Sequence, residues 1–113
     1  MIADEVLKNF ANSGYELQIK PQYRNMKVVL DRHPQVSANA LEAIRRAGLA
    51  PHRGSIRGGT DGSRLSHMGL PCPNIFAGEH AFHSRLEWVS VQDMQKAVET
   101  LIHLAMIWEE QAA

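Results

Sequence analysis

The sequence has little of several features that would direct a protein to particular partners. It contains one cysteine, Cys72, so no intrachain disulfide can form. Lysine plus arginine number 12 and aspartate plus glutamate number 12, which leaves no net charge to attract nucleic acid or an anionic membrane. No apolar run is long enough to span a membrane, and no signal peptide is visible. We therefore expect a reduced, cytoplasmic protein with no nucleic-acid or membrane partner.

What the sequence does contain is the composition of a globular chain. Its 113 residues suffice for one domain of ordinary size, and 44% of them are hydrophobic. Neither low-complexity sequence nor an internal repeat is visible. The chain is therefore expected to fold.

The beginning of the chain predicts the end of a separate unit. Residues 4–12 have apolar side chains at helical spacing, and Ser13-Gly14 is typical of a helix end. Residues 15–20 alternate apolar and polar side chains, which indicates a half-exposed strand of an antiparallel sheet. About 25 residues cannot form a domain alone. We predict that residues 1–27 are the tail of one domain and that residues 28–113 belong to another.

Three helices are predicted in the second unit. One starts at Pro34, which suits a first helical turn, and stops at Gly48; its buried stripe is Val36, Ala40, Ala43, Ile44 and Ala47. A second covers residues 61–68. Ser90 and Asp93 form a capping-box pattern ahead of a long terminal helix. One face of that helix is expected to be buried, through Val91, Met94, Val98, Leu101, Ile102, Ala105 and Trp108.

Apolar stretches between these helices predict strands at residues 53–57 and 72–77. Alternation of helices with apolar strands favours an α/β fold, a largely parallel sheet with helices on its faces. Such strands normally have parallel neighbours, so open edges and apolar surface would remain in a chain this short. We therefore expect the chain to self-associate.

The run "RGGTDG" indicates a turn that delivers the chain into a helix. Gly58 and Gly59 allow the backbone to approach a ligand closely, and the N–H groups of Thr60 and its successors could bind a carboxylate or phosphate. Arg57 could clamp a carboxylate with two hydrogen bonds. The alternative is an ordinary strand-to-helix turn beside a surface arginine.

The run "HAFH" offers two histidines, His80 and His83, but not the spacing of the zinc-protease motif. A zinc site would need further ligands, so a histidine without a metal is the more common situation. Cys72, between two prolines, is expected to be a packed thiol, and Trp88 and Trp108 are expected in the core. These residue patterns by themselves do not identify a reaction.

A longer stretch resembles a known family. Residues 56–102, "IRGGTDGSRLSHMGLPCPNIFAGEHAFHSRLEWVSVQDMQKAVETLI", resemble the C-terminal end of the peptidase T family, tripeptide aminopeptidases among the di-zinc aminopeptidases and acylases. The resemblance continues more loosely upstream through "YRNMKVVLDRHPQV". It implies that the chain leaves an inserted lid or dimerisation domain near Asn25 and finishes a catalytic α/β zinc-peptidase domain. It also implies a cytoplasmic hydrolase that removes the N-terminal residue from short peptides.

The resemblance assigns roles to residues of this chain. His83 matches a zinc ligand, and Glu87 matches an acid that would support the ligand or fix its loop. Asp61 matches a helix cap. The turn facing the carboxylate end of the substrate matches Arg57, Gly58, Gly59 and Thr60.

The same resemblance implies that the site is incomplete in this chain. The family's other ligands for its two zinc ions and its glutamate general base come from segments upstream of the lid domain. We therefore expect no catalytic residue in this chain, little or no zinc bound by one imidazole, and no peptidase activity from the 113 residues as a fragment. The alternative is a non-catalytic α/β module that binds a carboxylate ligand or mediates self-association.

Overall fold

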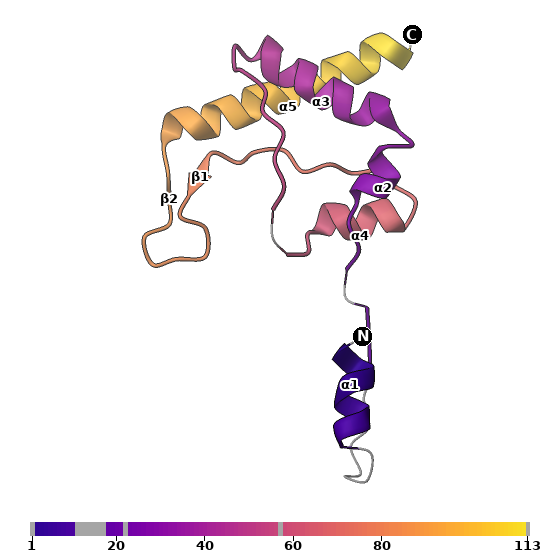
Figure 1. The fold of residues 1–113 in the computed structure, drawn as a ribbon. Helices are drawn as coiled ribbons and strands as arrows, with labels where there is room; N and C mark the ends of the chain where they lie inside the picture. Colours follow the sequence, from indigo (N-terminus) through magenta and orange to yellow (C-terminus); the bar gives the residue numbers. More distant parts are fainter. Residues whose placement is uncertain (1, 11–17, 22, 57, 113) are drawn as a thin grey trace.

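A computed structural model describes residues 2–10, 18–21, 23–56 and 58–112. Figure 1 shows helices and one small antiparallel sheet, a mixed α/β arrangement. In chain order the elements of the described residues are α1 (Ile2–Asn9), α2 (Lys27–Leu30), α3 (Pro34–Arg46), α4 (Asp61–His67), β1 (Glu79–His80), β2 (Trp88–Val89) and α5 (Val91–Ala112). None of the described helices is long and apolar enough to cross a membrane.

The core lies between α3 and α5, which are in contact and cross at an angle in Figure 1. The predicted stripe of α3 is confirmed for Ala40, Ala43 and Ala47, which are buried and small enough to let the two helices approach closely, whereas Val36 and Ile44 are only half-buried. Facing them, Thr100 and Ile107 are the buried residues of α5. The structure also confirms the first-turn position of Pro34 and the stop at Gly48, whose φ is +77°.

Polar contacts fix the register of the two helices. The Arg46 guanidinium donates two hydrogen bonds to the Glu110 carboxylate, at 2.9 and 3.0 Å. Asn39 and Gln111 exchange two amide hydrogen bonds, at 2.8 and 3.0 Å. At the C-terminus of α3, next to Arg46, the Lys96 ammonium donates to the Ala47 carbonyl at 2.7 Å and so satisfies one of the last carbonyls of the helix.

The capping box of α5 is confirmed, but the prediction of which face is buried was wrong. The Asp93 N–H donates to Ser90 Oγ at 3.0 Å, as a helix cap requires. The predicted face is open, however, and Trp108 is 41% exposed. α5 packs on α3 through nearly the opposite side, that of Thr100 and Ile107. Both sides of the helix are apolar, so the sequence pattern did not distinguish them.

The structure does not show the predicted parallel sheet. Residues 53–56 and 72–77 have no regular secondary structure, and residue 57 lies outside the described residues. The sheet that the described residues form is a hairpin, with Glu79 opposite Val89 and His80 opposite Trp88. A strand of a parallel sheet needs a neighbouring strand to pair its backbone groups. The described residues offer no such neighbour to either predicted strand. Trp88, predicted in the core, is 56% exposed on this hairpin.

The predicted N-terminal unit is only partly described. The helix predicted at residues 4–12 is observed as α1, Ile2–Asn9, which Figure 1 shows apart from the other helices. Residues 11–12 and the predicted helix end at Ser13-Gly14 lie outside the described residues. Residues 15–17 of the predicted strand lie outside the described residues, and residues 18–20 are not in a strand. The boundary near residues 25–27 stays a prediction.

The molecule is thin and open. Its extents are 62 × 39 × 18 Å and its radius of gyration is 19.7 Å, against about 13 Å for a compact domain of this size. Its accessible surface is 9370 Å², whereas a compact monomer of 12.6 kDa exposes about 6,200 Å². Much of the apolar surface that a domain would bury is therefore exposed.

Candidate functional site

The turn ahead of α4 is built around the hydroxyl group of Thr60. Thr60, and not Asp61 as the resemblance implied, is the N-cap of α4; it has an extended conformation, and its Oγ1 accepts a hydrogen bond from the Ser63 N–H at 3.1 Å. The Asn74 side chain donates to the same oxygen at 3.2 Å. Two segments distant in sequence therefore meet at this hydroxyl, which fixes the turn.

Glycines are required at this turn for two different reasons. Gly58 has a φ of +110°, a conformation that side chains disfavour. A Cβ at Gly59 would lie 3.2 Å from the Tyr23 ring, and a Cβ at Gly62 would lie 2.7 Å from the Cys72 carbonyl oxygen. The close packing leaves a hollow lined by Tyr23, Gly58, Gly59, Thr60, Asp61 and Arg64. Arg57, the predicted carboxylate clamp, lies outside the described residues.

Buried serines attach α4 to both flanking segments. The Ser63 hydroxyl donates to the Arg24 carbonyl oxygen, and the Cys72 N–H donates to Ser66 Oγ at 2.9 Å. Ser63 and Ser66 are both buried, so these bonds satisfy hydroxyls that would otherwise be costly to bury. The contact of Ser66 is structural. The Cys72 thiol is free and half-buried, in an irregular segment rather than the predicted strand.

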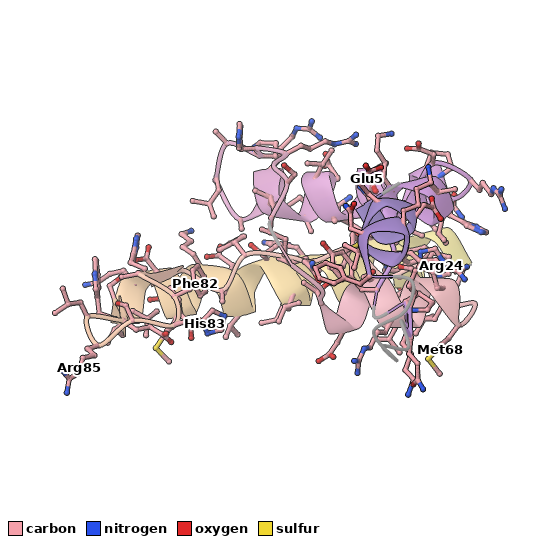
Figure 2. All side chains as sticks on the ribbon, turned by 60° about the horizontal axis from the view of Figure 1, so that its bottom comes forward. Glu5, Arg24, Met68, Phe82, His83 and Arg85 are labelled. Atoms are coloured by element: carbon pink, nitrogen blue, oxygen red, sulfur yellow. The ribbon has the colours of Figure 1, made fainter. Side chains whose placement is uncertain are left out.

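His83 lies on the loop that joins β1 to β2. Its backbone has a φ of +60°, and its N–H donates to Glu87 Oε2 at 2.6 Å. Two backbone hydrogen bonds, from Ser84 to Ala81 and from Glu87 to Ser84, shape the rest of the loop. The His83 residue is exposed, and Figure 2 shows it at the opposite end of the molecule from Arg24 and Met68.

His80 has a different environment from His83. Its ring stacks on Trp88, with centroids 4.3 Å apart and an interplanar angle of 15°. Its Nε2 lies 3.6 Å from the Asp93 carboxylate, which also accepts a hydrogen bond from the Ser90 hydroxyl. The two histidines of "HAFH" therefore do not act as a pair: one belongs to the packing between hairpin and α5, and the other stands on the exposed loop.

The described residues do not by themselves fit a zinc ion. Among them, no three histidine, cysteine, aspartate or glutamate side chains are grouped so that they could hold a metal. Figure 1 shows the loop of His83 and the turn of Thr60 at separate places. A protein zinc site needs at least three ligands, and His83 offers one imidazole.

Comparison with known proteins finds similarity to peptidase T of several bacteria. No family model matches it. It is 41% identical over 107 residues to peptidase T of Caldanaerobacter subterraneus subsp. tengcongensis, a match covering 95% of this chain and 26% of the relative. It is 42% identical over 109 residues to peptidase T of Clostridium perfringens, covering 96% and 27%.

The match extends to a further bacterium, Shewanella pealeana, whose peptidase T is 47% identical over 94 residues, covering 83% of this chain and 23% of the relative. This chain matches a segment of peptidase T. It spans about a quarter of the length of these three peptidase T relatives.

Two residues beside the glycine-rich turn were not predicted from the sequence. Tyr23 packs against Gly59, and Asn74 donates to Thr60. Asn74 had a weak signal, because an asparagine directly after a proline often fixes a loop through its side chain. Tyr23 had none, because its contact comes from a distant part of the chain.

Proposed function

We propose that this chain is part of a zinc-dependent aminopeptidase of the peptidase T kind, which removes the N-terminal residue from short peptides. The observation that carries the proposal is the identity of 41–42% to peptidase T relatives over at least 95% of the chain. The chain spans about a quarter of those relatives, so we assign the remaining zinc ligands and the general base to polypeptide outside it. By itself the 113-residue chain is then inactive.

In this proposal His83 supplies one zinc ligand. Three features support the assignment: the residue is exposed, it stands on a short loop, and the Glu87 carboxylate holds its backbone N–H at 2.6 Å. A ligand of a shared site has to project toward groups from elsewhere in the protein. A carboxylate that fixes the loop would preset the position of the imidazole.

The turn before α4 is proposed to receive the carboxylate end of the peptide. The hollow beside Gly58, Gly59 and Thr60 is open, and its lining includes one positive side chain, Arg64, and one negative side chain, Asp61. Arg57 directly precedes the turn in sequence and would add a second positive charge. The glycines keep the backbone accessible where side chains would fill the hollow.

A chimera tests the proposal: this whole chain replaces its counterpart in the Clostridium perfringens relative. We expect the chimera to hydrolyse a tripeptide in the presence of zinc. His83→Ala should lower kcat/KM at least about a hundredfold, since even supporting residues of metal sites cost 10- to 100-fold. His52→Ala is the matched control, because His52 is an exposed histidine outside both proposed sites, and it should leave the activity unchanged.

Two results would count against the proposal. One is a folded chimera with no tripeptide hydrolysis while the relative itself is active. The other is tripeptide hydrolysis by the 113-residue chain alone at the rate of an ordinary peptidase. Tripeptide binding by the chain alone, lost on changing Gly59→Val, would instead favour the alternative of a carboxylate-binding module.

A further inference from the structure

Helix α5 has an apolar face that the described part of the chain leaves uncovered. Its residues have exposed fractions between 48% at Met106 and 75% at Val91, and they are Val91, Met94, Val98, Leu101, Ile102 and Met106. We call this set the open face. It lies on nearly the opposite side of the helix from Thr100 and Ile107, which pack on α3. A helix that is apolar on both sides is typical of one buried between two layers.

The open face is also slightly hollowed. A groove along it is lined by Val91, Met94, Gln95, Val98, Glu99, Ile102 and His103. Glu99 is the one acidic residue in this lining, and its carboxylate is already paired with the Lys96 ammonium at 2.8 Å. The surface therefore offers apolar contact along most of its length and no unpaired carboxylate that would repel an apolar partner.

The amount of exposed surface indicates what kind of partner is needed. The chain exposes 9370 Å², against about 6,200 Å² for a compact monomer of its mass. The excess is several times the area of about 800 Å² that each partner buries in a standard interface. One contact with a second copy of this chain would leave most of that excess exposed. A large polypeptide that packs on several sides would cover it.

We propose that the open face of α5 docks the polypeptide that corresponds to the part of peptidase T this chain does not match. The inference rests on the proposed function. The matched segment is only 26–27% of two of the relatives, so the unmatched part has the size that the excess surface requires. The surface of that polypeptide that contacts α5 is expected to be apolar. It would add a second layer on the open face of α5, since the described part of the molecule is only 18 Å thick.

The chimera with the Clostridium perfringens relative tests this through the accessibility of Met94. Oxidation of Met94 by peroxide should be at least about tenfold slower in the folded chimera than in the chimera unfolded by urea, because oxidation follows exposure. A side chain that stays 52% exposed, as in the chain itself, would be slowed only about twofold. Met94 oxidised within about twofold of the unfolded rate would overturn the proposal.

Substitutions on α5 provide the second measurement. Val98→Asp and Ile102→Asp should each lower the melting temperature of the chimera by at least about 3 °C, since each would bury a charge. The same changes should leave the helicity of the 113-residue chain nearly unchanged, because both side chains are exposed there. Gln92→Asp adds the same charge outside the open face and should have little effect in either protein. Equal effects of Val98→Asp and Gln92→Asp in the chimera would overturn the proposal.

The remaining outcomes are also decisive. Protection of Met94 that disappears when the chimera is diluted to a monomer would assign the open face to a second copy and overturn the proposal. A chimera that does not fold, where the relative does, would overturn it because the chain then does not fit that polypeptide. A chimera in which Met94 is protected from oxidation but which does not hydrolyse a tripeptide would support this inference and overturn the proposed function. A chimera that hydrolyses a tripeptide while Met94 stays exposed would support the proposed function and overturn this inference.

Discussion

At the scale of single residues, the loop of His83 depends on one carboxylate. Glu87 Oε2 accepts the His83 N–H at 2.6 Å, where the His83 backbone has a φ of +60°. That conformation is uncommon for a residue with a side chain, so a charge-assisted hydrogen bond helps to hold it. The sequence identified both residues through a resemblance, and the structure adds the atom-to-atom contact between them.

Replacing Glu87 should loosen this loop. Glu87→Ala removes the acceptor, so hydrogen exchange of the His83 amide is expected to become several-fold faster, as measured by NMR. Glu79→Ala serves as control, since Glu79 is an exposed carboxylate on β1 of the same hairpin. An exchange rate that responds equally to both changes would contradict the role given to Glu87.

The Arg46–Glu110 pair should make the α3–α5 contact weaker in acid. The hydrogen bonds from Arg46 lower the pKa of Glu110 below its ordinary value of 4.5. A lowered pKa in the folded state stabilises the fold at pH values above 4.5, and the contribution is lost as pH falls through the folded value. The melting temperature should therefore drop below about pH 4.5, and less so in Glu110→Gln. The hydrogen bond from Lys96 lowers the pKa of Glu99 as well, so this pair also contributes to the loss of stability in acid. The melting temperature of Glu99→Gln is therefore measured over the same pH range to separate the two contributions.

At the scale of elements, caps and glycines determine where the helices begin and how closely they approach. Pro34 starts α3 and Ser90 caps α5, and both are signals contained in a few neighbouring residues. Gly78 acts differently. Its φ is +81°, and a Cβ at this position would lie 2.6 Å from the Asp93 Cβ. Only glycine therefore allows the backbone that leads into β1 to lie this close to α5.

Gly78→Ala should therefore destabilise the protein by more than about 1 kcal/mol, through backbone strain and the steric clash with α5. Gly54→Ala is a matched control, because a Cβ at Gly54 meets nothing within 4 Å. Urea unfolding followed by circular dichroism measures both. A Gly78→Ala protein as stable as Gly54→Ala would contradict the close approach of this segment to α5.

At the scale of the whole molecule, the chain has a helical core on one side and exposed apolar side chains on several others. α3 and α5 make the principal contact, while the open face of α5 is uncovered within the described residues. Folding stability should accordingly be low, because the apolar area buried is small for a chain of this length.

The 113-residue chain alone should associate with itself at micromolar concentration, because exposed apolar area is removed from water when copies meet. Light scattering measures the molar mass as the concentration is raised. Val98→Asp is expected to shift the association to higher concentration, and Gln92→Asp is not. A constant monomer mass across the micromolar range would contradict this prediction.

The sequence by itself determined most of the helices, since spacing, caps and stop signals act over a few residues, but it did not predict the short helix α2. α3, α4 and α5 were predicted from Pro34, from the residues around Thr60 and from Ser90. It also indicated the glycine-rich turn and the loop of His83, although the roles of these residues remain predictions. The domain boundary near residues 25–27 rests on sequence alone.

Only the tertiary structure decided what these elements contact. It showed which side of α5 packs on α3, and it brought Tyr23 and Asn74 to the turn of Thr60. It also left residues 72–77 irregular where a strand was predicted. These features depend on partners far away in the sequence: an apolar helix face or strand becomes buried only when another surface packs or pairs with it.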